Sequence, residues 1–235
     1  MDITVIFEKD SQDKGLHCGW GIAYLIGDEV LFDAGEKYEY LADNFKKLGV
    51  STDAIRHIVI SHNHWDHRQG IWPLLKEHGG MDLWVCEDFA GEFKSELQGH
   101  TVHIVEGVQP VIPGVFTSGC VPVQYKNKKI CEQALVIKGK EGLCVVCGCA
   151  HPGLIDIVRE VTEYFEVPVY ALLGGFHLMD KDARFVRYLS GELRAMGVKK
   201  IFPGHCTGYD AIKILEEEYR EDCMTLKTGM KIAVS

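Results

Sequence analysis

The sequence predicts an α/β fold with a mixed β-sheet. Short apolar segments rich in β-branched residues recur along the chain, as expected for buried strands. In the C-terminal half they alternate with segments whose apolar residues repeat at helical spacing, a pattern typical of α/β proteins. Near the N-terminus, two apolar segments flank the turn Gly27-Asp28 and predict an antiparallel hairpin.

The N-terminal half holds most of the predicted strands. They are expected over residues 3–7, 20–26, 30–33, 55–60, 82–86 and 101–105. Apolar residues at i, i+4 and i+7 predict a helix over about residues 37–48, and a second helix is expected over residues 87–97. Residues 8–17 are polar, so an exposed loop near the mouth of a site is expected there.

The C-terminal half alternates between strands and helices. Residues 131–138 and 143–147 are expected to form a strand pair around a glycine-bounded turn. Further strands are expected over residues 167–173 and 200–202, and helices over residues 154–165, over residues 209–219 and around Phe185, Leu189, Leu193 and Met196. A final pair of short strands closes the chain.

Composition favours a single domain over residues 1–235. Of the 235 residues, 46% are hydrophobic, enough for a sizeable core, and we find no repeat or linker. The net charge is −9 and the largest basic cluster is residues 126–129, so we do not expect a nucleic-acid partner. No signal peptide is visible and no apolar run approaches the ~18 residues of a membrane span, so no membrane partner is expected either. The nine scattered cysteines favour reduced thiols and a cytoplasmic location.

The densest group of ligand-type side chains is Ser61-His62-Asn63-His64-Trp65-Asp66-His67, directly after the strand over residues 55–60. If the first residues of the motif are extended, the side chains of His62 and His64 point the same way and can coordinate one metal. The chain then turns, and Asp66 and His67 fall near a second position. We therefore expect one or two divalent metals per chain, first of all zinc, with iron, manganese and magnesium as alternatives. Two metals roughly 3.5–4 Å apart can share a bridging water.

This motif resembles the signature of the metallo-β-lactamase superfamily. Leu31-Phe32-Asp33-Ala34-Gly35 is similar to its strand-ending Asp-x-Gly, and residues 148–153 and 203–208 are similar to its later ligand positions. The Gly-Cys-x-His, Gly-Gly-Phe-His-Leu and His-Cys-Thr-Gly set resembles the branch of dihydropterin–ribofuranosylaminobenzene 5'-phosphate synthase-like proteins. The resemblance covers the chain from about Leu16 onward. It implies an αβ/βα four-layer sandwich of two mixed β-sheets flanked by helices.

Further site residues are expected at other strand ends. The metal ligands expected with the help of the resemblance are His62, His64, Asp66, His67, His151 and His205. Asp33 is expected to orient a ligand histidine by accepting its other N–H. His177 follows two glycines and is expected to face the substrate or act in catalysis.

One feature departs from the superfamily pattern. The superfamily usually supplies a Gly-Asp whose carboxylate bridges two metals, but this chain has Gly148-Cys149, with His151 two residues on. Either Cys149 or His151 occupies that region, or the bridge is solvent only. A cysteine thiolate is a good zinc ligand, although Cys149 could equally be a buried thiol.

Three functions are compatible with these residues. The first is a hydrolase of a phosphate-bearing or ester small molecule (a phosphoesterase or lactonase), in which a metal-bound hydroxide attacks and Asp66 or the bridge region holds the nucleophile. The second is a transferase that joins a dihydropterin methyl diphosphate to a ribosylated arylamine phosphate with loss of pyrophosphate. The third is a non-hydrolytic metal-binding or redox-partner protein. A small-molecule substrate is expected, and a homo-oligomer stays open.

Overall fold

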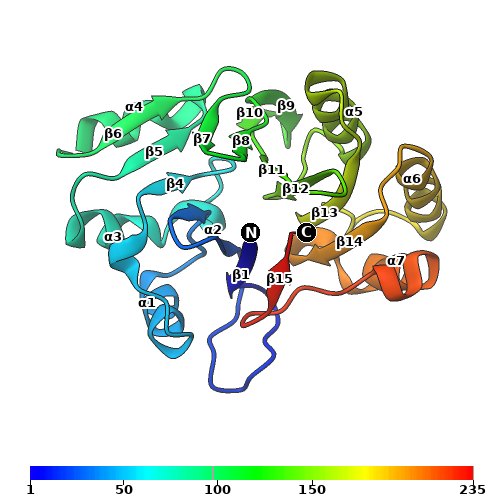
Figure 1. Cartoon of the computed structure of the whole chain (residues 1–235), viewed down its shortest axis with the longest axis horizontal. Helices are drawn as coiled ribbons and strands as arrows, with labels where there is room; N and C mark the ends of the chain where they lie inside the picture. Colours follow the sequence, from blue (N-terminus) through cyan, green and yellow to red (C-terminus); the bar gives the residue numbers. More distant parts are fainter. Residues whose placement is uncertain (97, 235) are drawn as a thin grey trace.

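The chain folds into four layers, with two β-sheets face to face and helices on the outside of each (Figure 1). A computed structural model describes residues 1–96 and 98–234. Strand β1 (Asp2–Phe7) pairs with β15 (Lys231–Ala233), which places the two ends of the chain side by side at the centre of the view. Apart from β15, the first sheet is built from the first six strands of the chain, and the second sheet is built from strands that follow them.

The first sheet has the strand order β15-β1-β2-β3-β4-β5-β6 and is mixed, with antiparallel pairs up to β3 and parallel pairs beyond it. Its remaining strands are β2 (Ala23–Ile26), β3 (Val30–Phe32), β4 (His57–Val59), β5 (Asp82–Val85) and β6 (Thr101–Ile104). Its outer face packs against the helices α1 (Tyr38–Lys47), α3 (Ile71–Glu77) and α4 (Glu87–Glu96). Of the helix predicted over residues 87–97, Leu97 lies outside the described residues.

The second sheet has the order β14-β13-β12-β11-β8-β7 and is also mixed. Its strands are β7 (Pro110–Ile112), β8 (Val115–Thr117), β11 (Leu135–Lys138), β12 (Leu143–Cys147), β13 (Val169–Gly175) and β14 (Lys200–Gly204). The helices on its outer face are α5 (Leu154–Phe165), α6 (Ala183–Ala195) and α7 (Tyr209–Tyr219). A separate hairpin consists of β9 (Val121–Tyr125) and β10 (Lys128–Glu132).

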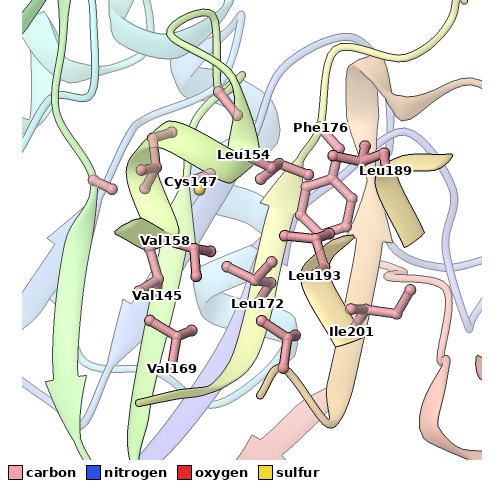
Figure 2. Packing of buried hydrophobic residues seen from close by; sticks show 14 of the residues in the cluster. Val145, Cys147, Leu154, Val158, Val169, Leu172, Phe176, Leu189, Leu193 and Ile201 are labelled. Atoms are coloured by element: carbon pink, nitrogen blue, oxygen red, sulfur yellow. The ribbon is translucent and has the colours of Figure 1, made fainter. Parts of the chain in front are cut away.

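Central strands of the second sheet are apolar on both faces because both faces are covered. In β12, Val145 and Cys147 pack toward the helices, whereas Cys144 and Val146 pack into the core between the two sheets. Figure 2 shows the helix side of this sheet, where Leu172 lies among side chains from β12, α5 and α6.

Helix α6 begins where Asp182 caps it by accepting a hydrogen bond from the Phe185 amide at 2.8 Å. Its buried face is formed by Val186, Leu189, Ser190 and Leu193. Phe185, which was expected to share that face, is 41% exposed and lies at its edge.

The predicted fold class, a sandwich of two mixed sheets flanked by helices, is confirmed. Two strand predictions were wrong. Residues 131–138 do not form one strand, because β10 ends at Glu132 and the chain bends before β11 begins at Leu135. A single strand, β15, closes the chain, since the segment before it crosses back to reach β1.

Two expectations about polar and sulfur-containing residues were also wrong. Glu8, at the start of the expected exposed loop, is fully buried, because backbone and side-chain donors surround it. Cys86 and Cys120, with Cα atoms 5.8 Å apart, are joined in a disulfide, so not every cysteine is a free thiol. No helix in the described part of the chain is both long and apolar enough to cross a membrane.

We predict that Leu172→Ala lowers the free energy of unfolding by about 2–5 kcal/mol, because it leaves a cavity in a packed layer. Urea unfolding followed by circular dichroism measures the change. Tyr188→Ala is the control, since Tyr188 is 57% exposed on α6, and it should change stability by less than about 0.5 kcal/mol. Equal losses in the two variants would contradict the layer assignment.

Candidate metal centre

The candidate ligands lie at one edge of the sandwich, just beyond the carboxyl ends of parallel strands. The motif loop follows β4, residues 149–151 follow β12, and His205 follows β14. Loops at such strand ends commonly form the sites of α/β proteins. The motif itself ends in the one-turn helix α2 (Trp65–Arg68), which turns Asp66 and His67 away from the extended His62–His64 segment.

His62, His64 and His151 form the first ligand set. The Nε2 atom of His62 lies 2.8 Å from Nδ1 of His64. The ring of His151 lies 4.8 Å from that of His62 and 5.0 Å from that of His64, centroid to centroid. One ligand atom from each residue lies within 4.8 Å of the others, close enough to share one metal.

Asp66, His67 and His205 form a second, more deeply buried set. The Oδ2 atom of Asp66 lies 3.7 Å from Nε2 of His67 and 3.5 Å from Nε2 of His205. The sets adjoin, because the His62 and His67 rings are 4.2 Å apart. The structure therefore brings together all six residues that the sequence suggested as ligands.

Cys149 lies where the superfamily pattern led us to expect a bridging aspartate. Its Sγ lies 3.4 Å from Nε2 of His67 and 3.3 Å from Sγ of Cys206. It groups with His62 and His67 on one side and with His205 and Cys206 on another. Of the alternatives left open by the sequence, the thiol of Cys149 occupies the region between the sets, and His151 belongs to the first set.

Hydrogen bonds from Nδ1 atoms orient three of the histidines. His67 donates to Asp33 Oδ2 at 2.7 Å. His62 contacts the hydroxyl of Ser61 at 2.9 Å, and that hydroxyl donates to the same Asp33 oxygen at 2.7 Å. The Nδ1 atom of His151 lies 2.7 Å from Glu132 Oε2. With Nδ1 used in this way, the Nε2 atoms are left for other partners.

Two carboxylates in this arrangement, Glu132 and Glu8, were missed by sequence reasoning. Glu132 accepts hydrogen bonds from the amides of Cys149, Ala150 and His151 at 2.7–2.8 Å. Glu8 accepts from the amide of His205 at 2.7 Å. A signal was present, because each is an acid at the end of a strand-forming segment, directly after two apolar residues.

Burial and neighbouring charges set the protonation of the centre. Burial lowers the pKa of His62 and His205 well below the usual value and lowers that of His64 to about 4. Burial opposes the charge of His67 too, but the adjacent Asp33 outweighs it and raises the pKa to about 9. His62, His64 and His205 are therefore neutral at neutral pH, the form that a metal requires.

Residues with left-handed backbone also gather at this edge. Asp33, Ala150, His177 and His205 have φ values between 44° and 57°. Such conformations are uncommon outside glycine and cluster at functional sites, where surrounding contacts hold them. Here the hydrogen bonds to Glu132 and Glu8 hold two of these loops.

The donor set fits a divalent metal. His151 Nε2 is buried and has no hydrogen-bond partner among the described residues, although its Nδ1 is firmly held. A buried polar atom without a partner is costly, and a metal shared with His62 and His64 would satisfy it. Imidazole, carboxylate and thiol groups together favour zinc or iron over magnesium.

His177 lies beside the first ligand set, with its ring 4.6 Å from that of His151. Its Nδ1 atom is buried and has no hydrogen-bond partner among the described residues.

Cys206 follows the candidate ligand His205, and its thiol is buried next to Cys149. Burial would raise the pKa of its thiol, but hydrogen bonding with Cys149 and His177 lowers it to about 6.

A cavity of about 450 Å³ opens onto both ligand sets. Its lining residues are Trp20, His64, Trp65, Asp66, Tyr125, Lys126, Lys128, Ile130, Cys149, His151, His177, Met179, His205 and Cys206. The volume suits a small molecule. Lys14 and Arg68 do not line it, and Arg68 pairs with Glu92.

Comparison with known proteins identifies the architecture. No family model matches the chain. The solved structure of Tm1679, described as a metal-dependent hydrolase of the β-lactamase superfamily, aligns over 100% of this chain and 99% of its own, with 26% identity and a TM-score of 0.84. The chain has the metallo-β-lactamase fold. The metallo-β-lactamase fold protein YhfI from Bacillus subtilis also aligns, over 99% of each chain, with 14% identity and a TM-score of 0.71.

A similar sequence is named for a different reaction. The chain is 28% identical to the 7,8-dihydropterin-6-methyl-4-(β-D-ribofuranosyl)-aminobenzene-5'-phosphate synthase of Methanocaldococcus jannaschii, over 89% of this chain and 88% of that protein. An uncharacterized protein of the same archaeon is 24% identical over 80% of this chain and 82% of its own length. The resemblance of this metallo-β-lactamase-fold chain to the superfamily and to its synthase-like branch is confirmed.

We predict that Glu132→Gln weakens zinc binding about 10- to 100-fold, because it removes the charge that orients His151 and anchors its loop. Competition with a chromogenic chelator measures the affinity. Glu163→Gln, on the exposed side of α5, is the matched control and should leave the affinity unchanged. Unchanged affinity in Glu132→Gln would contradict the orienting role.

We predict that His64→Ala removes most of the bound metal, whereas His177→Ala leaves the metal content near that of the wild type. His64 groups with His62 and His151, whereas His177 groups with Cys149 and His151 only and is expected to face the substrate. Elemental analysis of protein purified without added metal provides the measurement. Loss of metal in His177→Ala would show that His177 is itself a ligand.

Proposed function

We propose that this chain is a metal-dependent enzyme that hydrolyses a small phosphate-bearing or ester molecule. The observation that carries the proposal is the pair of adjoining ligand sets at the floor of a single cavity of about 450 Å³. The similarity to a protein described as a metal-dependent hydrolase supports the same class.

The first metal would be held by His62, His64 and His151, and the second by Asp66, His67 and His205, with Cys149 between them. Divalent metals in such a pair lower the pKa of bound water and polarise a phosphoryl or carbonyl oxygen. The deeply buried second set and the more open first set differ in exposure, so the two positions need not bind with equal affinity.

The surrounding side chains would orient the substrate and move a proton. His177 lines the cavity, and its unpartnered Nδ1 can donate a proton to a leaving-group oxygen. Asp66 lines the cavity beside His205 and would present the second metal to the reacting group. Trp20 packs against His205 at 4.8 Å between ring centroids, and with Trp65 and Tyr125 it would shield the reacting group from bulk water.

A transferase is the second candidate, and the 28% identical synthase is the observation that favours it. A dihydropterin methyl diphosphate would then react with a ribosylated arylamine phosphate and release pyrophosphate. The same centre would clamp the diphosphate. The two candidates differ in whether water or an arylamine is the acceptor.

We predict that zinc-loaded protein hydrolyses at least one member of a panel of phosphomonoesters, phosphodiesters and lactones. His177→Ala should lower kcat about 10²–10⁴-fold, because it removes a positioned proton donor. His64→Ala is the control for dependence on the metal and should be inactive. Firm metal binding without any hydrolysis would overturn the hydrolase and favour the transferase, which an assay for pyrophosphate release from the pterin diphosphate and arylamine pair tests directly.

A further inference from the structure

The β9–β10 hairpin is separate from both large sheets (Figure 1). Four of its residues, Tyr125, Lys126, Lys128 and Ile130, line the cavity. Its strands pair with each other, with Tyr125 opposite Lys128 and Val123 opposite Ile130. The two turn residues, Lys126 and Asn127, have left-handed φ values of 46° and 63°. A two-residue turn of this kind matches the twist of the strands and fixes their register.

The base of the hairpin is fixed to the metal centre. Glu132, the last residue of β10, holds the amides and the ring of the His151 loop. The neighbouring amide of Cys131 donates to Asp88 of α4 at 3.2 Å. One carboxylate therefore sets both the position of a candidate ligand and the position of the hairpin relative to it.

Strand alternation decides which side chains of the hairpin face the cavity. Tyr125, Lys128 and Ile130 share one face, and all three line the cavity. The Tyr125 ring lies 4.5 Å from that of His151, centroid to centroid. Lys129 alternates to the other face, is exposed, and does not line the cavity.

Positive charge collects at the hairpin end of the cavity. Among the described residues, Lys126 and Lys128 are the basic side chains that line it. Asp66 is the acidic one, and it belongs to the second ligand set. In the described part of the chain, neither lysine forms an ion pair with a carboxylate; Lys126 Nζ lies 5.0 Å from the Tyr125 ring. Two cations without acidic partners in the wall of the cavity complement an anion.

We propose that Lys126 and Lys128 form a subsite for a second anionic group of the substrate, a phosphate or carboxylate remote from the reacting bond. A planar ring between the two ends of the substrate packs against Tyr125. The substrate class is therefore a small aromatic molecule with a phosphate or ester at one end and an anion at the other. This inference rests on the proposed function, because the reacting end must lie at the metal centre.

Two non-hydrolysable probes test the subsite without relying on turnover. Phenylphosphonate carries one anionic group, and 4-carboxyphenylphosphonate adds a carboxylate at the far side of the ring. Titration calorimetry on zinc-loaded protein should show that the carboxylated probe binds about fivefold or more tightly, a preference that falls as salt is raised. The double variant Lys126→Gln/Lys128→Gln should bind both probes with equal affinity.

Lys129→Gln is the matched control, since it removes a charge from the same hairpin on its outer face, and it should keep the wild-type preference. Equal affinity for the two probes in the wild type, or an unchanged preference in the double variant, would overturn the subsite alone. Failure of both probes to bind the wild type would overturn the proposed function and the subsite together.

Discussion

Buried carboxylates that accept hydrogen bonds from backbone amides organise this centre. A carboxylate removed from water is stable only if donors surround it. Asp33, Glu132 and Glu8 accept hydrogen bonds from the amides of Ser61, His151 and His205, respectively. Despite burial, these donors and His151 lower the pKa of Glu132, whereas burial outweighs the donors at Glu8 and raises its pKa to about 7. Each loop is thereby held at a fixed strand end. These contacts fix the positions of the metal ligands. They also hold the left-handed backbone at Ala150 and His205.

Close approach of the carboxylates depends on glycine. A Cβ atom at Gly148 would lie 2.2 Å from the Ser61 hydroxyl oxygen, and one at Gly204 would lie 2.4 Å from Glu8 Oε2. Both distances are far shorter than any tolerable contact. Glycine is therefore needed at these two positions for close packing between the two sheets and not for chain flexibility. Any side chain there would push the carboxylate network apart.

Local spacing was enough to predict the motif and most strands, because His62 to His67 are neighbours in sequence and strand periodicity is short-ranged. The roles of Glu8 and Glu132 were beyond such reasoning. Glu8 meets His205 across 197 positions, and Glu132 at the end of β10 binds the amides of the loop that follows β12. These contacts exist only once the sheets have packed, so a local pattern can mark the two acids at strand ends but not the partners that they bind.

The candidate ligands come from both sheets: His62 to His67 follow a strand of the first, and Cys149, His151 and His205 follow strands of the second. Each ligand set takes two residues from the first sheet and one from the second, so an ion held by either set binds the docked sheets and not the separated ones. Occupancy and folding are then thermodynamically linked, and at 100 times its dissociation constant such an ion would add about 2.7 kcal/mol to the stability of the native state. By the same linkage, a variant that loosens sheet docking far from the site would weaken metal affinity, so chelator titrations also report on the distant core.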